Sequence, residues 1–222
     1  MRWIFTVIMI CVSVCAVHGQ DKVDEQKEQN QATYILGTHN SGTSYKLVWW
    51  LQSMAPMING TSRCQSKTIE EQLELGVRLF NLQIVYYHKD WYISHGMGIY
   101  NVKLFDILEK IEKYDETYFQ LVLDKNLLKG QNVEKYLELV ETLKKKYENG
   151  NCVMLWAWIE GKRFVFKNKK SISLEERYWT KDQDFPGMLD NVPLPRHYAK
   201  KYNQQYRAEC KAKYLMLDFV EL

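Results

Sequence analysis

The chain has 222 residues, of which 46% are hydrophobic, 14% aromatic and 26% charged, and its formal net charge at pH 7 is +3. A chain of this length and composition can bury one substantial core and hardly two. So weak a net charge argues against a general nucleic-acid binder, which needs a concentrated basic surface. We therefore expect one folded domain and no nucleic-acid partner.

Residues 1–19 have the order of a secretory signal peptide. Arg2 precedes an apolar run from Trp3 to Val17, which ends in small residues at Ala16 and Gly19. The run is short for a membrane span, although a retained signal anchor is the alternative. We expect removal of this segment and a secreted or periplasmic protein.

Residues 20–32 are polar without apolar periodicity, which predicts a flexible leader and places the folded domain at residues 33–222. Strands are predicted at 33–38, 77–87, 91–96, 118–124, 152–159 and 214–220, and helices at 68–76, from Leu104 to Ile111 and from Val133 to Leu143. Thr68 and Glu71 have the spacing of a capping box at the start of the first helix. Residues 160–213 are charged and hold all the prolines but Pro56, so we expect loops with short elements there.

Strands that are apolar on both faces and separated by helices imply a parallel sheet covered on its outside. A small or incomplete β/α barrel and a doubly wound sheet both fit this α/β alternation. Glycine-rich phosphate loops and a GxSxG elbow are absent from the sequence, so nucleotide binding and serine hydrolase chemistry have no support.

Three cysteines follow the expected leader, at Cys64, Cys152 and Cys210. An oxidising compartment permits one disulfide among them. The pair Cys64 and Cys210 is favoured, because Cys152 opens the apolar run CVMLWAW and suits a buried strand. No spacing in the sequence is typical of a zinc site.

Two histidines stand at the ends of predicted strands. His39 lies in the motif GTHNSGT, where Gly37 and Gly42 are expected to let the chain turn tightly. His95 ends the run WYISH. Because chemistry in both candidate folds occurs at the carboxyl ends of strands, these imidazoles could work as an acid and base pair near neutral pH.

The motifs carry a family resemblance. In chain order they are GTHNSGT, TIEEQLELGVRLFNLQI, WYISHG, FQLVLDK and YLMLDFV. This order resembles the catalytic X domain of phosphatidylinositol-specific phospholipase C, and the small bacterial-type enzymes most closely. It covers residues 33–125 well and 213–220 less firmly, while residues 126–212 match only in the order of strands and helices. The resemblance implies a small, distorted or incomplete TIM-type β/α barrel.

The resemblance also implies a mechanism and a substrate class. His39 would be the general base for the inositol 2-hydroxyl, His95 the general acid for the departing diacylglycerol oxygen, and Asp218 the carboxylate that orients the base. The partner would be an inositol phospholipid or a related phosphodiester. We then expect the two imidazole rings within about 8 Å, with Asp218 hydrogen-bonded to one of them.

The strand after the first helix departs from the family pattern. Where relatives carry an acid and an arginine, or two acids, this chain has Asn81 and Gln83, and Asn40 stands where bacterial relatives often have Asp. Alternation sends Asn81 and Gln83 to the barrel interior as uncharged substrate-binding residues. Amides in place of both acids predict no metal and no cofactor. Lys125, just after LVLD, is the best candidate for the missing cation.

Two other functions remain open. A catalytically impaired protein that binds an inositol lipid without turnover is favoured by the two amides and opposed by the retained His39, His95 and Asp218. A glycerophosphodiester phosphodiesterase is less favoured, because it needs a carboxylate metal site. We expect a monomer, whose Trp49 or Trp50 could seat it transiently at a membrane surface.

Overall fold

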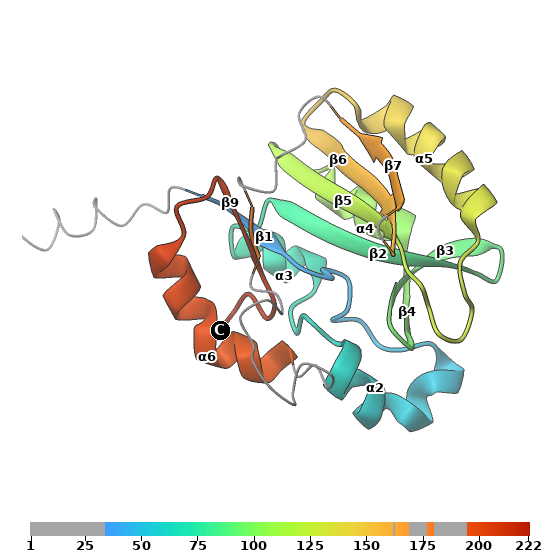
Figure 1. Ribbon diagram of the computed structural model, residues 1–222, viewed down its shortest axis with the longest axis horizontal. Coiled ribbons are helices and arrows are strands. Elements are labelled where there is room, and N and C mark those ends of the chain that lie inside the picture. Colours follow the sequence, from blue (N-terminus) through green and yellow to red (C-terminus); the bar gives the residue numbers. More distant parts are fainter. Residues whose placement is uncertain (1–33, 162, 169–176, 180–194) are drawn as a thin grey trace, which may run out of the picture. The chain divides into compact units, whose positions relative to one another are not determined.

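The computed structural model of the protein describes residues 34–161, 163–168, 177–179 and 195–222 (Figure 1). The expected signal peptide and leader lie outside the described residues. The segment Tyr34–Leu222 forms one compact unit. Across the described residues, no helix is both long enough and apolar enough to cross a bilayer.

The strands of the described residues form one sheet. They are β1 (Ile35–Thr38), β2 (Leu79–Tyr87), β3 (Asp90–His95), β4 (Gly98–Lys103), β5 (Thr117–Leu123), β6 (Cys152–Ile159), β7 (Arg163–Lys167), β8 (Arg177–Trp179) and β9 (Tyr214–Leu217). The order is β7-β6-β5-β2-β1-β9-β8, and β3 pairs with both β2 and β4. The pairs β1–β2, β1–β9, β2–β5, β5–β6 and β8–β9 are parallel, whereas β3, β4 and β7 pair antiparallel with their neighbours.

The strand order decides between the two candidate folds. The last strand, β9, pairs in parallel with the first, β1, while β2, β5, β6 and β7 run outward from β1 on its other side and β8 lies beyond β9. A last strand that returns beside the first is the connectivity of a closed β/α barrel. Within the described ranges β7 and β8 do not pair, so the sheet stays open. The fold is therefore an incomplete, distorted β/α barrel, as the resemblance implied.

The helices are the short 3-10 helix η1 (Trp49–Met54), α2 (Ala55–Ser62), α3 (Ile69–Glu74), α4 (Leu104–Ile111), α5 (Val133–Tyr147) and α6 (Pro195–Glu209). The three predicted helices are confirmed as α3, α4 and α5. Thr68 and Glu71 make both hydrogen bonds of the predicted capping box, which satisfies two backbone donors at the start of α3.

Helix α6 and the last strand differ from the prediction. The 15-residue helix α6 lies where we expected loops, because its buried positions are only Ala199, Asn203 and Tyr206 and one of them is polar. The last strand was predicted to reach residue 220 but ends at Leu217, and the chain then turns through Phe219, which has φ of 44°. Asp218 consequently stands just beyond the strand.

The two faces of β2 meet different surroundings. Phe80, Leu82 and Ile84 are fully buried in the large apolar core. Leu79, on the opposite face, belongs to a small apolar cluster with Val153, Leu155, Tyr214 and Met216. The strand of alternating character was therefore correctly predicted, and its inner face carries the polar residues considered below.

The glycines of the first motif act through packing rather than through turning, which corrects our expectation. A Cβ at Gly37 would overlap Met216 Sδ, and one at Gly42 would lie 2.8 Å from Ile93 Cγ1. Neither glycine has a positive φ; the left-handed residue of this turn is Asn40, with φ of 46°. Asparagine tolerates that conformation better than most residues, because its short polar side chain bonds locally.

The favoured disulfide is absent. Cys64, Cys152 and Cys210 are all buried thiols. The Cys64 sulphur is turned toward Asn40 and His95, whereas the Cys210 thiol donates to the carbonyl of Ala212 at 3.6 Å. The pairing of Cys64 with Cys210 is therefore wrong, because spacing along the chain said nothing about the direction of either side chain.

Candidate functional site

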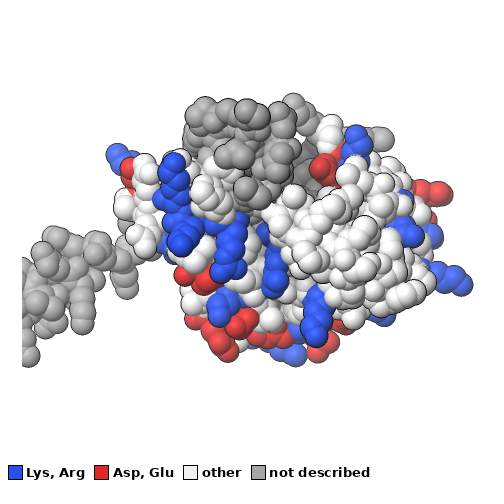
Figure 2. All heavy atoms as spheres, turned by 90° about the horizontal axis from the view of Figure 1, so that it is seen from below, with Lys and Arg blue, Asp and Glu red and all other residues white. Residues whose placement is uncertain are grey.

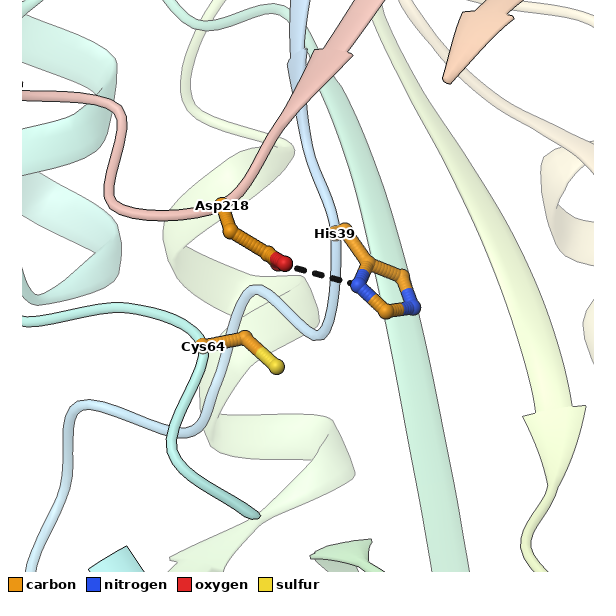
Figure 3. A group of neighbouring side chains, drawn as sticks. All are labelled: His39, Cys64 and Asp218. Atoms are coloured by element: carbon orange, nitrogen blue, oxygen red, sulfur yellow. Dashed lines mark hydrogen bonds and ion pairs between the residues drawn. The ribbon is translucent and has the colours of Figure 1, made fainter. Parts of the chain in front are cut away.

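His39 and Asp218 meet because β1 and β9 end side by side. Thr38 and Leu217, the last residues of the two strands, are paired in register, and the next residue of each chain segment carries the functional side chain. The His39 backbone N–H donates to the Leu217 carbonyl at 3.0 Å. The His39 Nδ1 then lies 2.9 Å from Asp218 Oδ1 (Figure 3).

This contact sets the tautomer of His39. A carboxylate only accepts hydrogen bonds, so Nδ1 carries the proton and donates it to Asp218. The lone pair of the neutral ring is therefore on Nε2. The Asp218 carboxylate also stabilises the imidazolium that forms when Nε2 takes up a proton.

His95 lies beside His39 but comes from the hairpin of β3 and β4. It ends β3, and its ring centroid lies 6.1 Å from that of His39, at an interplanar angle of 75°. Its Nδ1 donates to the Ser62 carbonyl at 2.8 Å, which leaves Nε2 for other partners. The rings thus lie within the distance expected from the sequence, with Asp218 bonded to one of them.

The surroundings of His95 disfavour its charged form. Burial is the main cause that lowers the pKa of His95 from its ordinary value of 6.5, and the neighbouring His39 lowers this pKa further. The hydrogen bond to the Ser62 carbonyl and the charges of Asp218 and Glu160 oppose the shift without cancelling it. His95 therefore holds a proton less tightly than a histidine in water.

The turn that carries His39 is bonded to β2. The Asn40 backbone N–H donates to Asn81 Oδ1 at 3.3 Å, and the Ser41 N–H donates to the Asn81 carbonyl at 2.9 Å. Asn81 in turn donates its backbone N–H to Ser41 Oγ at 3.0 Å. Asn40 and Asn81, both named from the sequence, thus hold the histidine-bearing turn against the sheet.

Amide groups occupy the inner face beside this turn. Asn81 and Gln83 share that face of β2, and Asn81 Nδ2 lies 3.5 Å from Gln120 Oε1 on β5. Gln83 Oε1 and Gln120 Nε2 are buried and make no hydrogen bond to any residue that the structure describes. Buried polar atoms are usually paired, so these two atoms are candidates for contact with the polar groups of a ligand.

The cation candidates are less well placed. Lys125 is exposed, and it contributes its backbone N–H, not its side chain, to a hydrogen bond with Glu160. The Arg63 guanidinium is bound to the carbonyls of Gln65 and Ser44. Arg78 donates to the carbonyls of Leu73 and Val77, and its guanidinium lies over the ring of Tyr114.

Sequence reasoning missed two groups near the histidines. Gln65 Nε2 donates to the carbonyls of His39 and Leu217, at 2.9 and 2.8 Å, and so ties together the ends of β1 and β9. Cys64 Sγ lies 3.4 Å from Asn40 Nδ2 and 3.7 Å from His95 Nδ1. No periodicity or motif marks either residue, because both belong to the irregular segment after α2.

Asp124 is a third omission, and alternation with Gln120 along β5 could have indicated it. Its carboxyl group is buried, accepts a hydrogen bond from Ser94 and shares another with Glu160. Burial and the adjacent Glu160 raise the pKa of Asp124 to about 8. A neutral acid therefore stands at the end of β5 near neutral pH, next to Lys125.

The fold has close counterparts among solved structures. Phosphatidylinositol-specific phospholipase C from Listeria monocytogenes matches 86% of this chain and 89% of its own, with a TM-score of 0.54 and 17% identity. Two mutants of the Staphylococcus aureus enzyme match the same share of this chain and 87% and 86% of their own, with TM-scores of 0.52 and 0.53 and identities of 14% and 13%.

No family model matches the sequence, and no curated protein matches it either. At such low identity the likeness establishes the fold alone. The chain therefore has an incomplete β/α barrel similar in fold to these phospholipases C, with two histidines and an aspartate gathered at the ends of its strands.

Proposed function

We propose that this protein is a secreted or periplasmic, metal-independent phosphodiesterase that cleaves phosphatidylinositol or a related inositol phosphodiester. The observation that carries the proposal is the hydrogen-bonded pair His39–Asp218 with the ring of His95 6.1 Å from that of His39. Two imidazoles at this separation can contact opposite sides of one phosphate group. The likeness of the fold to bacterial phospholipases C supports the same reading.

The reaction follows from the tautomers. His39 Nε2 removes the proton of the inositol 2-hydroxyl, and the resulting oxygen attacks phosphorus within the same molecule. The bond from phosphorus to the diacylglycerol oxygen breaks, and the proton on His95 Nε2 passes to that oxygen. The products are a cyclic inositol phosphate and diacylglycerol. Asp218 holds the His39 ring in place and stabilises its charged form while the proton is there.

The amide groups of the inner face could bind the hydroxyl groups of a substrate. Gln83 Oε1 and Gln120 Nε2 are buried without a described partner and lie on the inner face near the histidine-bearing turn. An acceptor and a donor suit hydroxyl groups, which both donate and accept. A polyhydroxylated ring such as inositol could satisfy both amides at once.

A second function rests on a different observation. The inner positions of β2 carry amides, and the nearby cations Arg63 and Lys125 are bound elsewhere or exposed. Loss of a group that stabilises developing charge costs roughly 10² to 10³ in rate in other enzymes. A protein that binds an inositol phosphodiester without turnover is therefore the competing proposal.

Incubation with labelled phosphatidylinositol, with and without a chelator, separates the two. An enzyme releases cyclic inositol phosphate in both conditions, and His39→Ala abolishes it. His197→Ala is the matched control, because His197 is exposed on α6 and its loss should leave the rate unchanged. Binding of the lipid without any product supports the second function, and the absence of both binding and product refutes each.

Contact with a membrane surface is a further part of the proposal. Trp49 is 84% exposed, and Met54 and Met57 beside it are also exposed. Figure 2 shows Lys and Arg atoms gathered on the side of α6 and a broad uncharged area on the side of η1 and α2. Exposed aromatic and apolar side chains favour the interfacial region of a bilayer.

Vesicle binding tests this contact. Trp49→Ala should weaken binding to phosphatidylcholine vesicles that contain phosphatidylinositol by about tenfold, equal to roughly 1.4 kcal/mol. Phe105→Ala on α4 removes another exposed aromatic ring and should leave binding unchanged. Equal effects of the two variants would show that η1 is not the part of the protein that contacts the membrane.

We also propose that the protein is a monomer, and sedimentation of the chain without lipid measures its oligomeric state.

A further inference from the structure

The thiol of Cys64 stands beside the pair His39–Asp218. One ligand atom from each of His39, Cys64 and Asp218 lies within 4.8 Å of the others (Figure 3). His39 and Cys64 are buried, and Asp218 is partly buried. The three residues come from the end of β1, the segment after α2 and the end of β9, so only the fold brings them together.

The position of Cys64 is set by its backbone. The Cys64 N–H donates to Thr43 Oγ1 at 3.0 Å, and the Cys64 carbonyl accepts from the Phe219 N–H at 2.7 Å. These bonds tie the cysteine both to the His39 turn and to the residue after Asp218. Cys64 is therefore held next to the pair, with its sulphur within 4.8 Å of a ligand atom of each.

We propose that His39 Nδ1, Cys64 Sγ and one oxygen of Asp218 form a binding site for a thiophilic divalent cation, with Zn²⁺ as the best match. Tetrahedral zinc binds nitrogen, sulphur and oxygen at roughly 2.0 to 2.3 Å, which separates its ligand atoms by roughly 3.3 to 3.8 Å. The group is already close to that size. The 2.9 Å between His39 Nδ1 and Asp218 Oδ1 has to widen by roughly half an ångström.

The donor set selects among metals. Calcium and magnesium require several oxygen ligands, and this group offers a single carboxylate. Thiolate and imidazole instead favour zinc and similar transition metals. His95 is not one of the three residues of this group. Water completes the fourth position.

Binding of the cation releases protons in a balanced exchange. The Cys64 thiol loses its proton and His39 loses the one on Nδ1, so about two protons leave for each cation bound. The bonds from the metal to sulphur, nitrogen and oxygen replace metal–water bonds and the hydrogen bond between His39 and Asp218. No electron is transferred.

The bound cation blocks the base. A neutral imidazole whose Nδ1 binds a metal carries its proton on Nε2 and has no lone pair left to accept another. Zinc and the proposed general base thus exclude each other, and the site works as an inhibitory switch. This consequence rests on the proposed function, whereas the binding of the metal does not.

A titration with Co²⁺ tests the binding directly. Cobalt replaces zinc with the same tetrahedral preference and shows a near-ultraviolet charge-transfer band when it binds a thiolate. We expect one Co²⁺ per chain with that band, and its displacement by Zn²⁺. Cys64→Ser should remove the band and weaken affinity by more than about 100-fold, since loss of a partner that only orients a ligand already costs roughly 10- to 100-fold.

Matched variants control for thiols and for folding. Cys152→Ser and Cys210→Ser remove the other buried thiols of the folded unit and should keep the band. The circular dichroism of Cys64→Ser should equal that of the wild type, and His39→Ala should weaken Co²⁺ binding while it keeps the thiol. No band in the wild type, or a band that survives in Cys64→Ser, overturns the proposal.

Activity separates this inference from the proposed function. Zn²⁺ should lower the hydrolysis of phosphatidylinositol by the wild type at least about tenfold, and it should lower that of Cys64→Ser much less, each relative to its own rate with chelator. A cobalt band without turnover under any condition refutes the phosphodiesterase and leaves the metal site. Turnover without a cobalt band refutes the metal site alone.

Discussion

The two faces of the sheet differ in what they contribute. On β2 the outer residues Phe80, Leu82 and Ile84 are fully buried in the large core, where they contact helices and neighbouring strands. The inner face has one apolar layer, represented by Leu79, and above it the amides of Asn81 and Gln83. The outer face stabilises the fold, and the inner face, which could not be filled with apolar atoms without loss of the site, positions polar groups.

The largest expected effect is on the inner face, at the carboxylate beside the base. Asp218→Asn should lower kcat by roughly 10³ to 10⁴, because an amide can donate to His39 Nδ1 and thereby moves the ring proton to Nε2. KM should change little, since Asp218 holds the base rather than the substrate. Steady-state kinetics measure kcat and KM separately. A raised KM with an unchanged kcat would contradict the role of Asp218 in holding the base.

The outer face should show its effect in stability. Phe80→Ala should lower the free energy of unfolding by roughly 3 to 5 kcal/mol, because it removes a fully buried ring and leaves a cavity. Gln83→Ala, three residues on and facing inward, should cost less than about 1 kcal/mol, since its Oε1 makes no described hydrogen bond. Urea unfolding of both variants measures these losses. Equal losses of unfolding free energy would contradict the difference between the two faces.

The buried acid at the end of β5 should couple stability to pH. The pKa of Asp124 in the folded protein, about 8, lies above its ordinary value of 3.8. The stability that the neutral carboxyl group contributes is therefore full at low pH, declines as pH rises above about 3.8 and is lost once pH has passed about 8. Asp124→Asn keeps a donor toward Glu160 and cannot ionise. The variant should be more stable than the wild type by roughly 1 to 3 kcal/mol near pH 8.

Urea unfolding near pH 5 and near pH 8 measures this difference. The advantage of Asp124→Asn should grow with pH across that interval, because the folded wild type still holds the Asp124 proton while its unfolded chain has released it, whereas the amide has no proton to exchange. An advantage of the same size at both pH values would show that the substitution acts through packing, and that Asp124 is not held neutral in the fold.

The smallest expected effect is the position of the pH profile. As a general acid His95 must carry a proton, and its pKa lies below 6.5 because of burial and the nearby His39. The log of kcat/KM should therefore begin to fall with rising pH below 6.5. In kcat the same limb should lie at higher pH, by less than about one unit, because the bound phosphate favours the imidazolium. An alkaline optimum would contradict the assignment.

Much of the fold could be predicted because local patterns agree with the tertiary structure. The alternation in VRLFNLQIVYY, the capping box at Thr68 and the helical stripe from Leu104 to Ile111 each describe one element, and each element is present. Helix α6 escaped prediction because its contact face is short and partly polar. The hairpin strand β4 escaped because it follows β3 after two residues without a separate pattern of its own.

The candidate site was predictable only in part. His39, His95 and Asp218 stand in motifs at strand ends, so their residue types and places could be named in advance. Cys64 and Gln65 could not be assigned to the site, since their positions depend on how an irregular segment packs against distant residues, whereas alternation along β5 could have indicated Asp124. Lys125, named from its motif position, is exposed, and its role in binding substrate stays a prediction.

The sequence by itself determined the strands and helices, the direction that alternation gives to Asn81 and Gln83, and the two histidine motifs, because these depend on neighbours within a few residues. Only the tertiary structure decided that β9 returns beside β1, that His39 Nδ1 bonds Asp218, and that three cysteines remain thiols. Those features join residues up to 179 positions apart, and contacts at such separation follow from packing of the whole sheet.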